Sequence, residues 1–267
     1  MIQTDLQLAQ ACRELAQNVK TLYVLGSFGL PMTDSGKKRA LERYAYNQKA
    51  ARKKKILAAS ADTFGFDCVC MIKGLLWGFA GDSAKTYGGA AYKSRGVPDV
   101  NADGMIALCK EVSTDFSGIQ IGEAVWQKGH IGVYIGDGLA VECTPKWDDG
   151  VQITAVHNLG KKTGYNGRSW TKHGRLPWIT YEQSAPIKND YAQSRDKALA
   201  GLYRVESDIG LKLRSGPSTK KPILETMPQG ALVRCYGYYT GNWLYVVSPT
   251  GKEGFCYRGY LWRATDE

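Results

Sequence analysis

The stretch HIGVYIGDGLAVECT, residues 130–144, reads as two strands joined by a tight turn. A two-residue turn would place Glu142 among the apolar side chains, whereas a three-residue Gly-Asp-Gly loop would pair it with Gly132. Because a shift of one residue turns every side chain to the other face of a sheet, burial favours the second register. The sequence therefore predicts a hairpin with His130 and Glu142 on one face, as diagonal neighbours within reach of each other.

A candidate nucleophile lies upstream, in FGFDCVCMIKGLLWGF at residues 64–79. Asp67 is a good N-cap, so Cys68 would occupy the first turn of a buried helix, where the helix dipole and unpaired amides are expected to lower its thiol pKa. The amide of Val69 would point toward an oxyanion formed on a bound substrate. Together with the histidine and the glutamate of the hairpin, this set is typical of covalent acyl transfer, provided that helix and hairpin meet.

The two cysteines of this segment, Cys68 and Cys70, have other interpretations. Zinc ligation with a histidine is disfavoured, because C-x-C lacks the usual spacing of such pairs and there is no second pair; we therefore predict no metal and no cofactor. A disulfide between them would be strained inside a helix. Cys70, about 200° further round the helix, is expected to pack inward. The other histidines, His157 at a strand end and His173 in a loop, are expected to be surface or packing residues.

The chain divides into two regions of different character. The predicted elements besides the hairpin are helices at 5–19, with Asp5 as N-cap, and at 37–60, and strands at 122–127 and 150–156. Helices followed by an antiparallel sheet indicate an α+β domain over residues 1–183. A polar segment without a clear period, residues 184–199, is predicted to be a linker. Residues 200–267 then show short β-rich runs separated by turns, at the spacing of a small all-β barrel.

The charge of the chain indicates an anionic partner. The net charge is +10, and nine Lys or Arg residues stand between Lys37 and Lys55 against the single Glu42. This run is either a solvated helix face or a surface that docks onto a polyanion. On charge alone, nucleic acid, an acidic membrane face and an anionic cell-wall polymer all stay open as partners.

The chain is expected to be a soluble, reduced cytoplasmic product. Its first residues lack the basic and apolar regions of a signal peptide and resemble an amphipathic helix instead. There is no apolar run of about 18 residues, so no membrane span is predicted. The seven cysteines are irregularly spaced, which argues against a disulfide framework.

Four segments resemble motifs of the NlpC-type papain-like cysteine peptidases, over about residues 10–180. They are GFDCVC for the nucleophile, GHIGVYIGDGLAVE for the histidine hairpin, GEAVWQ for the Gly-Asp strand before it, and LYVLGSFG for the upstream Tyr-x-x-Gly segment. The resemblance implies a papain-like fold with Cys68 as nucleophile, His130 as base and Glu142 as orienting residue. It also implies that the hydroxyl of Tyr23 lies near the oxyanion or the substrate.

The resemblance further implies a function at the bacterial cell wall. Such enzymes cleave stem-peptide bonds of peptidoglycan, often between D-γ-glutamate and a diamino acid, and some relatives of the same fold are N-acetylmuramoyl-L-alanine amidases. Residues 200–267 resemble a bacterial SH3-like domain, which in similar enzymes is generally a cell-wall anchor. The implied protein is a peptidoglycan hydrolase that acts on the wall after release, as a phage or prophage lysin does.

The sequence departs from the family pattern at several positions. Val69 and Cys70 replace the usual Ser-Gly, and Glu142 stands where His, Asn or Gln is commoner. A basic insertion at about residues 33–63 could shape substrate access or bind anionic wall polymer. Two other hypotheses stay open: a non-catalytic wall-binding protein, and nucleic-acid binding through residues 37–55. Nucleic-acid binding ranks last, because stacking aromatics are not organised around the basic run.

Overall fold

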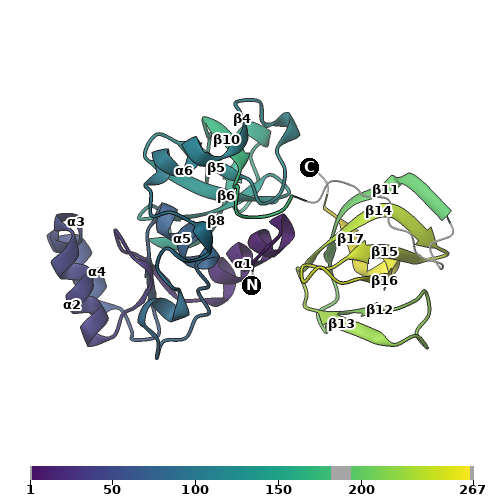
Figure 1. Ribbon diagram of the computed structural model, residues 1–267, viewed down its shortest axis with the longest axis horizontal. Helices are drawn as coiled ribbons and strands as arrows, with labels where there is room; N and C mark the ends of the chain where they lie inside the picture. The colour runs from purple at the N-terminus through teal and green to yellow at the C-terminus, as the bar shows by residue number, and fades with distance from the viewer. Residues whose placement is uncertain (1, 182–193, 265–267) are drawn as a thin grey trace. The chain divides into compact units, whose positions relative to one another are not determined.

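The computed structural model describes residues 2–181 and 194–264 of the chain. These residues belong to two compact units, one within residues 1–180 and the other within residues 181–267 (Figure 1). The N-terminal unit combines helices with two sheets, and the described residues of the C-terminal unit form one sheet. The chain therefore has the predicted α+β class with an all-β unit after it.

The helices α1, α5 and α6 cover one face of the main sheet of the N-terminal unit. α5 contacts both α1 and α6, and all three contact strands near the centre of that sheet. The apolar side of α1 is buried there, which explains its amphipathic pattern. The α-helices are α1 (Asp5–Asn18), α2 (Asp34–Arg43), α3 (Ala45–Gln48), α4 (Ala50–Ala58), α5 (Cys68–Leu76) and α6 (Ala102–Leu108).

The main sheet has seven strands and a second, smaller sheet has three. The main sheet is antiparallel except for its last pair, which is parallel. In sheet order its strands are β4 (Lys110–Ser113), β10 (Lys172–Arg175), β5 (Ala124–Gln127), β6 (His130–Gly136), β7 (Leu139–Thr144), β8 (Gly150–Val156) and β9 (Gly167–Arg168). The small sheet contains, in order, β1 (Thr21–Tyr23), β3 (Phe64–Phe66) and β2 (Phe28–Pro31). The strands predicted at 122–127, in the hairpin 130–144 and at 150–156 correspond to β5–β8, whereas β1–β3 and α6 lie outside every predicted element.

The hairpin of β6 and β7 has the predicted register, with Gly132 opposite Glu142. Its turn differs from the prediction. Only Asp137 and Gly138 form the tip, both with positive φ (56° and 66°), and a bulge in β6 takes up the extra residue. Burial of the apolar face thus selects the register, and the bulge makes a two-residue turn compatible with that register.

The first helix begins with a different cap from the predicted one. Thr4, and not Asp5, is the N-cap of α1, because Thr4 is extended (φ −121°, ψ 163°) and its hydroxyl accepts the amide of Gln7. The Gln7 side chain binds back to the Thr4 amide and completes a capping box. Asp5 is the first helical residue, where its negative charge meets the positive end of the helix dipole.

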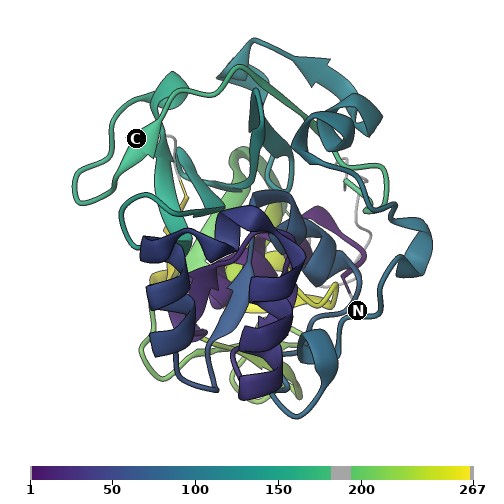
Figure 2. The same cartoon turned by 90° about the vertical axis from the view of Figure 1, so that its left-hand side faces the viewer.

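The basic insertion consists of α2, α3 and α4, not of the single helix predicted at 37–60 (Figure 2). The chain turns out of the helical conformation at Tyr44 (ψ 130°) and at Lys49 (ψ 135°). The ring of Tyr44 packs directly on Gly26, where an added Cβ would lie 1.9 Å from it. Tertiary contact with the rest of the unit therefore overrides the helical preference of the local sequence.

The C-terminal unit is a seven-stranded sheet in the order β13-β12-β16-β15-β14-β11-β17. All seven strands contribute to one buried core, so the sheet curls around it. The strands are β11 (Ser194–Val205), β12 (Leu211–Arg214), β13 (Ile223–Met227), β14 (Leu232–Thr240), β15 (Trp243–Val247), β16 (Glu253–Tyr257) and β17 (Leu261–Arg263). The short 3-10 helices of the chain lie at Thr86–Gly89, Ser94–Gly96, Phe116–Gly118, His157–Leu159 and Arg258–Tyr260.

The prediction of a linker at residues 184–199 is partly wrong. Residues 184–193 lie outside the described residues. Residues 194–199 are the first part of β11, where Ser194 and Arg195 pair with Tyr239 and Tyr238 of β14. The polar composition of residues 194–199 suggested a linker. They form a strand because they pair with a strand about 40 residues further along the chain, and a local sequence pattern cannot predict such long-range pairing.

Candidate functional site

Cys68 is the first residue of α5, and the local sequence fixes the start of this helix. Asp67 is extended (φ −113°, ψ 179°) and accepts the amide of Cys70 at 2.7 Å, as predicted for an N-cap. Its other oxygen accepts the amide of Gly26 at 2.7 Å, which ties the helix start to the loop after β1. Because α5 packs against β6 and β7, the helix and the hairpin do meet.

Glu142 and His130 form the second part of the site. His130 Nε2 lies 2.6 Å from Glu142 Oε2, and Glu142 is fully buried (0% exposed). Burial would raise the pKa of Glu142, but its contacts with His130, Arg168 and Thr154 outweigh burial and hold the pKa below its usual value. The carboxylate is therefore ionised at neutral pH. It orients the imidazole through Nε2 and leaves Nδ1 for proton transfer.

Three residues that the sequence did not single out complete this cluster. Thr154 Oγ1 and Arg168 Nε donate to Glu142 Oε1 at 2.8 and 3.0 Å, and Arg168 Nη2 lies 2.6 Å from Oε2. The His130 ring stacks on Trp170, with centroids 5.5 Å apart and an interplanar angle of 9°. The alternation in β8 could have indicated Thr154. Arg168 comes from the two-residue strand β9, which has no sequence signal.

The thiol of Cys68 has surroundings that contradict the prediction of a lowered pKa. Cys68 is 8% exposed. Burial, together with the Asp67 carboxylate, raises the pKa of the thiol to about 12 and outweighs the backbone amides of Ile131, Val69 and Cys68 itself. Desolvation therefore destabilises the thiolate by more than the first turn of the helix stabilises it. At neutral pH the thiol is protonated.

The structure brings Cys68 to the backbone of the hairpin. The backbone amide of Ile131 is close enough to the thiol to lower its pKa, whereas within the described residues no hydrogen bond joins the thiol to His130. The register explains this arrangement. Cys143, on the apolar face of the hairpin, is close enough to Cys68 for the two groups to interact electrostatically. Because side chains alternate along a strand, His130 and Glu142 point to the opposite face. His130 is the first residue of β6, and its ring is held by Glu142 and by stacking on Trp170.

Tyr23, predicted to lie near the oxyanion or the substrate, and Val69, predicted to donate to the oxyanion, are both close to Cys68. Tyr23 ends β1 and is within electrostatic reach of Cys68 and Asp67. Burial, together with these groups, raises the pKa of Tyr23 above its usual value, so its hydroxyl remains a donor. Val69 is 7% exposed, and its amide belongs to the first turn of α5, where amides lack intrahelical acceptors.

The basic insertion holds the loop that follows Tyr23. Asn47 is fully buried (0% exposed), donates to the Leu25 carbonyl at 3.1 Å and accepts the Leu25 amide at 3.0 Å. Arg52 donates to the Tyr23 carbonyl at 3.1 Å and pairs with Asp149 at 2.6 Å. With the packing of the Tyr44 ring on the same loop, these contacts make the insertion part of the site's framework.

The remaining histidines lie outside this cluster. His157 begins a 3-10 turn directly after β8, at the strand end as predicted. His173 is in β10 and 4% exposed, not in a loop: pairing with β5 extends this segment, and the ring binds Glu123 and the Asp115 carbonyl. All seven cysteines are free thiols, and Cys70 is buried. Within residues 2–181 and 194–264, no group of three or more His, Cys, Asp or Glu side chains is arranged to hold a metal ion.

The C-terminal unit is a small antiparallel sheet curled around one apolar core. Its residues 209–261 match the family model of the bacterial SH3 domain, which confirms the predicted SH3-like part of the chain. No curated protein matches the chain, and no solved structure does. Among the residues that the structure describes, none of the helices has the length and apolar character needed to cross a membrane.

Proposed function

We propose that the N-terminal unit is an NlpC-type papain-like cysteine endopeptidase that cleaves stem peptides of bacterial peptidoglycan, and that the SH3 domain binds the cell wall. The observation that carries the proposal is the meeting of two parts: Cys68 at the start of α5, and the His130–Glu142 hydrogen bond of 2.6 Å on the hairpin that α5 contacts. Bacterial SH3 domains are often found in cell-wall-associated proteins, and the match to this family supports the second half of the proposal.

The chemistry follows from a neutral thiol. Because the pKa of Cys68 is about 12, His130 acts as a general base and takes the thiol proton at Nδ1 while Sγ attacks the peptide carbonyl. The Tyr23 hydroxyl and the Val69 amide donate to the oxyanion. The C–N bond then breaks, His130 returns the proton to the leaving amine, and a thioester remains. Water hydrolyses the thioester with His130 again as base, which frees the thiol and the new carboxylate.

The direct test is hydrolysis of purified peptidoglycan. We expect Cys68→Ala to lower the rate by at least about 1000-fold, as the loss of a nucleophile does in other covalent enzymes. Cys70→Ala is the matched control, because it removes a buried thiol of the same helix and should keep the rate within about tenfold. Hydrolysis by Cys68→Ala at the wild-type rate would show that the nucleophile assignment is wrong.

Non-catalytic binding of the cell wall is the second candidate function. The burial of Cys68 and the raised pKa of its thiol favour it, since an unreactive cysteine has these properties. This candidate predicts that wild-type protein sediments with peptidoglycan sacculi and releases no fragments from them. Mass spectrometry of the supernatant separates the two candidates and identifies the bond if one is cleaved.

A further inference from the structure

A cavity of about 260 Å³ lies at the start of α5. Its lining includes both sequence neighbours of Cys68, Asp67 and Val69, and also Arg43 and Tyr44 from the basic insertion. A peptide that crosses the start of α5 would present one carbonyl to Cys68 and the adjoining residue to this cavity. The charges in the cavity would then decide which residue fits beside the cleaved bond.

Three of the four charged side chains in the cavity are satisfied within the protein. Asp67 accepts two backbone amides. The side chain of Lys73 is 4% exposed and binds both Asp99 and the Val100 carbonyl. Asp99 also accepts the hydroxyl of Tyr92 at 2.8 Å. The two carboxylates and the lysine are thus parts of the cavity wall, with little capacity left for a ligand.

Arg43 is the fourth charged side chain, and it differs from the others. In the part of the chain that the structure describes, its guanidinium has no ion pair and no hydrogen bond; its Cζ lies 5.7 Å from the centroid of the Tyr44 ring. Tyr44 in turn rests on Gly26, at the loop that Asp67 also binds. The insertion therefore presents an available cation to the cavity from a supported position.

We propose that Arg43 binds a carboxylate on the substrate residue next to the cleaved bond, so that the N-terminal unit selects acidic stem peptides over their amidated forms. This inference rests on the proposed function, because it defines a subsite of the same enzyme. A guanidinium binds a carboxylate through two parallel hydrogen bonds. A carboxamide carries no charge and has one acceptor oxygen, so it would lose most of this interaction.

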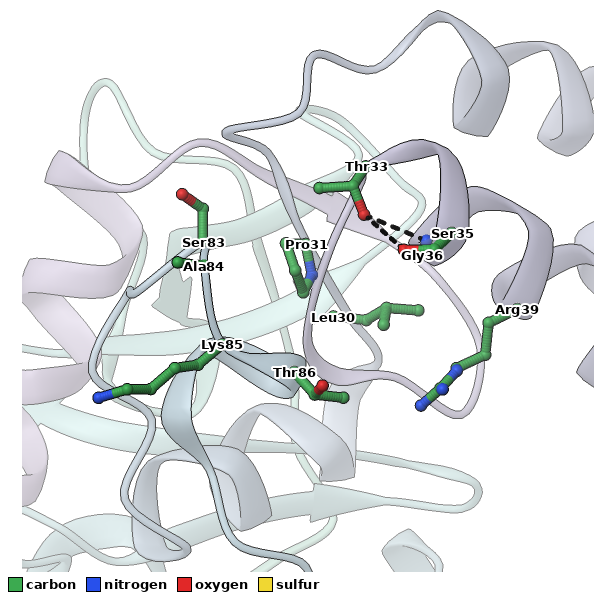
Figure 3. A pocket seen from close by; sticks show the side chains of 10 residues that line it. All are labelled: Leu30, Pro31, Thr33, Ser35, Gly36, Arg39, Ser83, Ala84, Lys85 and Thr86. Carbon is green, nitrogen blue, oxygen red and sulfur yellow. Dashed lines mark hydrogen bonds between the residues drawn. The ribbon is translucent and has the colours of Figure 1, made fainter.

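Arg39 provides a matched control for Arg43. It lies one turn earlier on α2 and lines a different cavity, between the start of α2 and residues 83–86 (Figure 3). Its guanidinium lies 5.7 Å from the centroid of the Tyr87 ring. Arg39→Gln therefore removes the same charge from the same helix and leaves the cavity beside α5 unchanged.

The test compares two synthetic stem peptides that differ in one group. The γ-linked D-glutamate next to the cleaved bond has a free carboxylate in one peptide and a carboxamide in the other. We expect wild-type kcat/KM to be on the order of 10–100-fold higher for the acid peptide. Arg43→Gln should bring this ratio close to one, chiefly by lowering kcat/KM for the acid peptide, and Arg39→Gln should keep the wild-type ratio.

Several results would overturn the proposal: a ratio near one in wild type, an unchanged ratio in Arg43→Gln, or an equal loss in Arg39→Gln. If wild-type protein cleaves neither peptide, the proposed function is wrong. Calorimetry with the same two peptides then tests the Arg43 site by binding alone. Tighter binding of the acid peptide that Arg43→Gln removes supports the site. Equal binding of both peptides by wild type contradicts it.

Discussion

The carboxylate of Glu142 is surrounded by partners in a place that water does not reach. It contacts His130, Arg168 and Thr154 and is 0% exposed. The side chain of Arg168 is 14% exposed, so loss of the carboxylate would leave a largely desolvated guanidinium without its acidic partner. Removing one member of a buried ion pair costs about 3–5 kcal/mol, because the other charge stays desolvated. Glu142 therefore supports the folded state as well as the orientation of His130.

We predict that Glu142→Gln lowers the free energy of unfolding of the N-terminal unit by about 3 kcal/mol at pH 7. The pKa of Glu142 is lowered in the folded state, so its contribution is complete above the unfolded pKa and is lost as pH falls through the folded pKa. The difference between wild type and variant, measured by denaturant unfolding, should stay constant from pH 7 to about pH 5 and should shrink below about pH 4.

Glu42→Gln is the control for this experiment, because the Glu42 side chain is 65% exposed and its ion pair with Lys38 lies on the surface. It should change the free energy of unfolding by less than about 1 kcal/mol at every pH. A Glu142→Gln difference that stays constant down to pH 3 would contradict the linkage argument.

The pH dependence of Cys68 alkylation distinguishes a general-base mechanism from a preformed thiolate–imidazolium pair. With a pKa of about 12, alkylation of Cys68 by iodoacetamide should be slow at pH 7 and should rise about tenfold per pH unit toward pH 9. Peptide mapping by mass spectrometry measures the rate at this residue. Fast alkylation that is independent of pH between 6 and 8 would instead indicate an ion pair at rest.

At the scale of elements, the basic insertion is a structural part of the candidate site. The helices α2–α4 contribute Asn47 and Arg52 to the loop around Tyr23, and Arg43 and Tyr44 to the cavity beside α5. Its exposed lysines still give the unit a basic surface for an anionic wall polymer, which remains a proposed partner. The insertion therefore has one side committed to packing and another side open to solvent.

We predict that Asn47→Ala lowers the free energy of unfolding by about 2–4 kcal/mol, since it removes the partner of part-buried backbone groups of Leu25 and of the buried Ala40 carbonyl. Chemical denaturation of the N-terminal unit measures this loss. Gln48→Ala removes the neighbouring, exposed amide, which makes one hydrogen bond to Leu41, and should cost less than about 1 kcal/mol. Equal losses in the two variants would show that Asn47 does not fasten the insertion.

At the scale of the whole molecule, the chain joins two units of different composition. The C-terminal unit has its own core of buried residues drawn from all seven of its strands. The N-terminal unit has the helix-covered sheet and the candidate site. Each unit thus has the apolar interior that independent folding requires.

We predict that, when the two units are produced separately, the N-terminal unit keeps the hydrolytic activity and the C-terminal unit keeps the binding to the cell wall. Residues 1–181 should hydrolyse a soluble stem peptide at a rate within about threefold of the full chain and should lose most binding to sacculi, because avidity from the second unit is gone. Residues 194–264 should still sediment with sacculi. Wild-type levels of sacculus binding by residues 1–181 alone would contradict a wall-binding role for the SH3 domain.

The sequence by itself determined those features whose cause is local or periodic. The alternation of apolar residues in 130–144 selected one register, because only that register buries all of them, and the register places His130 beside Glu142. Asp67 was identified as an N-cap from its position before an apolar run. The turn-rich C-terminal region indicated the SH3-like unit that the family match confirms.

Only the tertiary structure decided the features that depend on groups far apart in the chain. The pKa of Cys68 is raised and not lowered, because burial under the hairpin exceeds the effect of the helix start. Arg168 reaches Glu142 from 26 residues away. The chain leaves the predicted helix at Tyr44 and Lys49, and Tyr44 and Asn47 contact the loop at 23–26. Desolvation and long-range pairing are properties of the assembled fold, so no local pattern contains them.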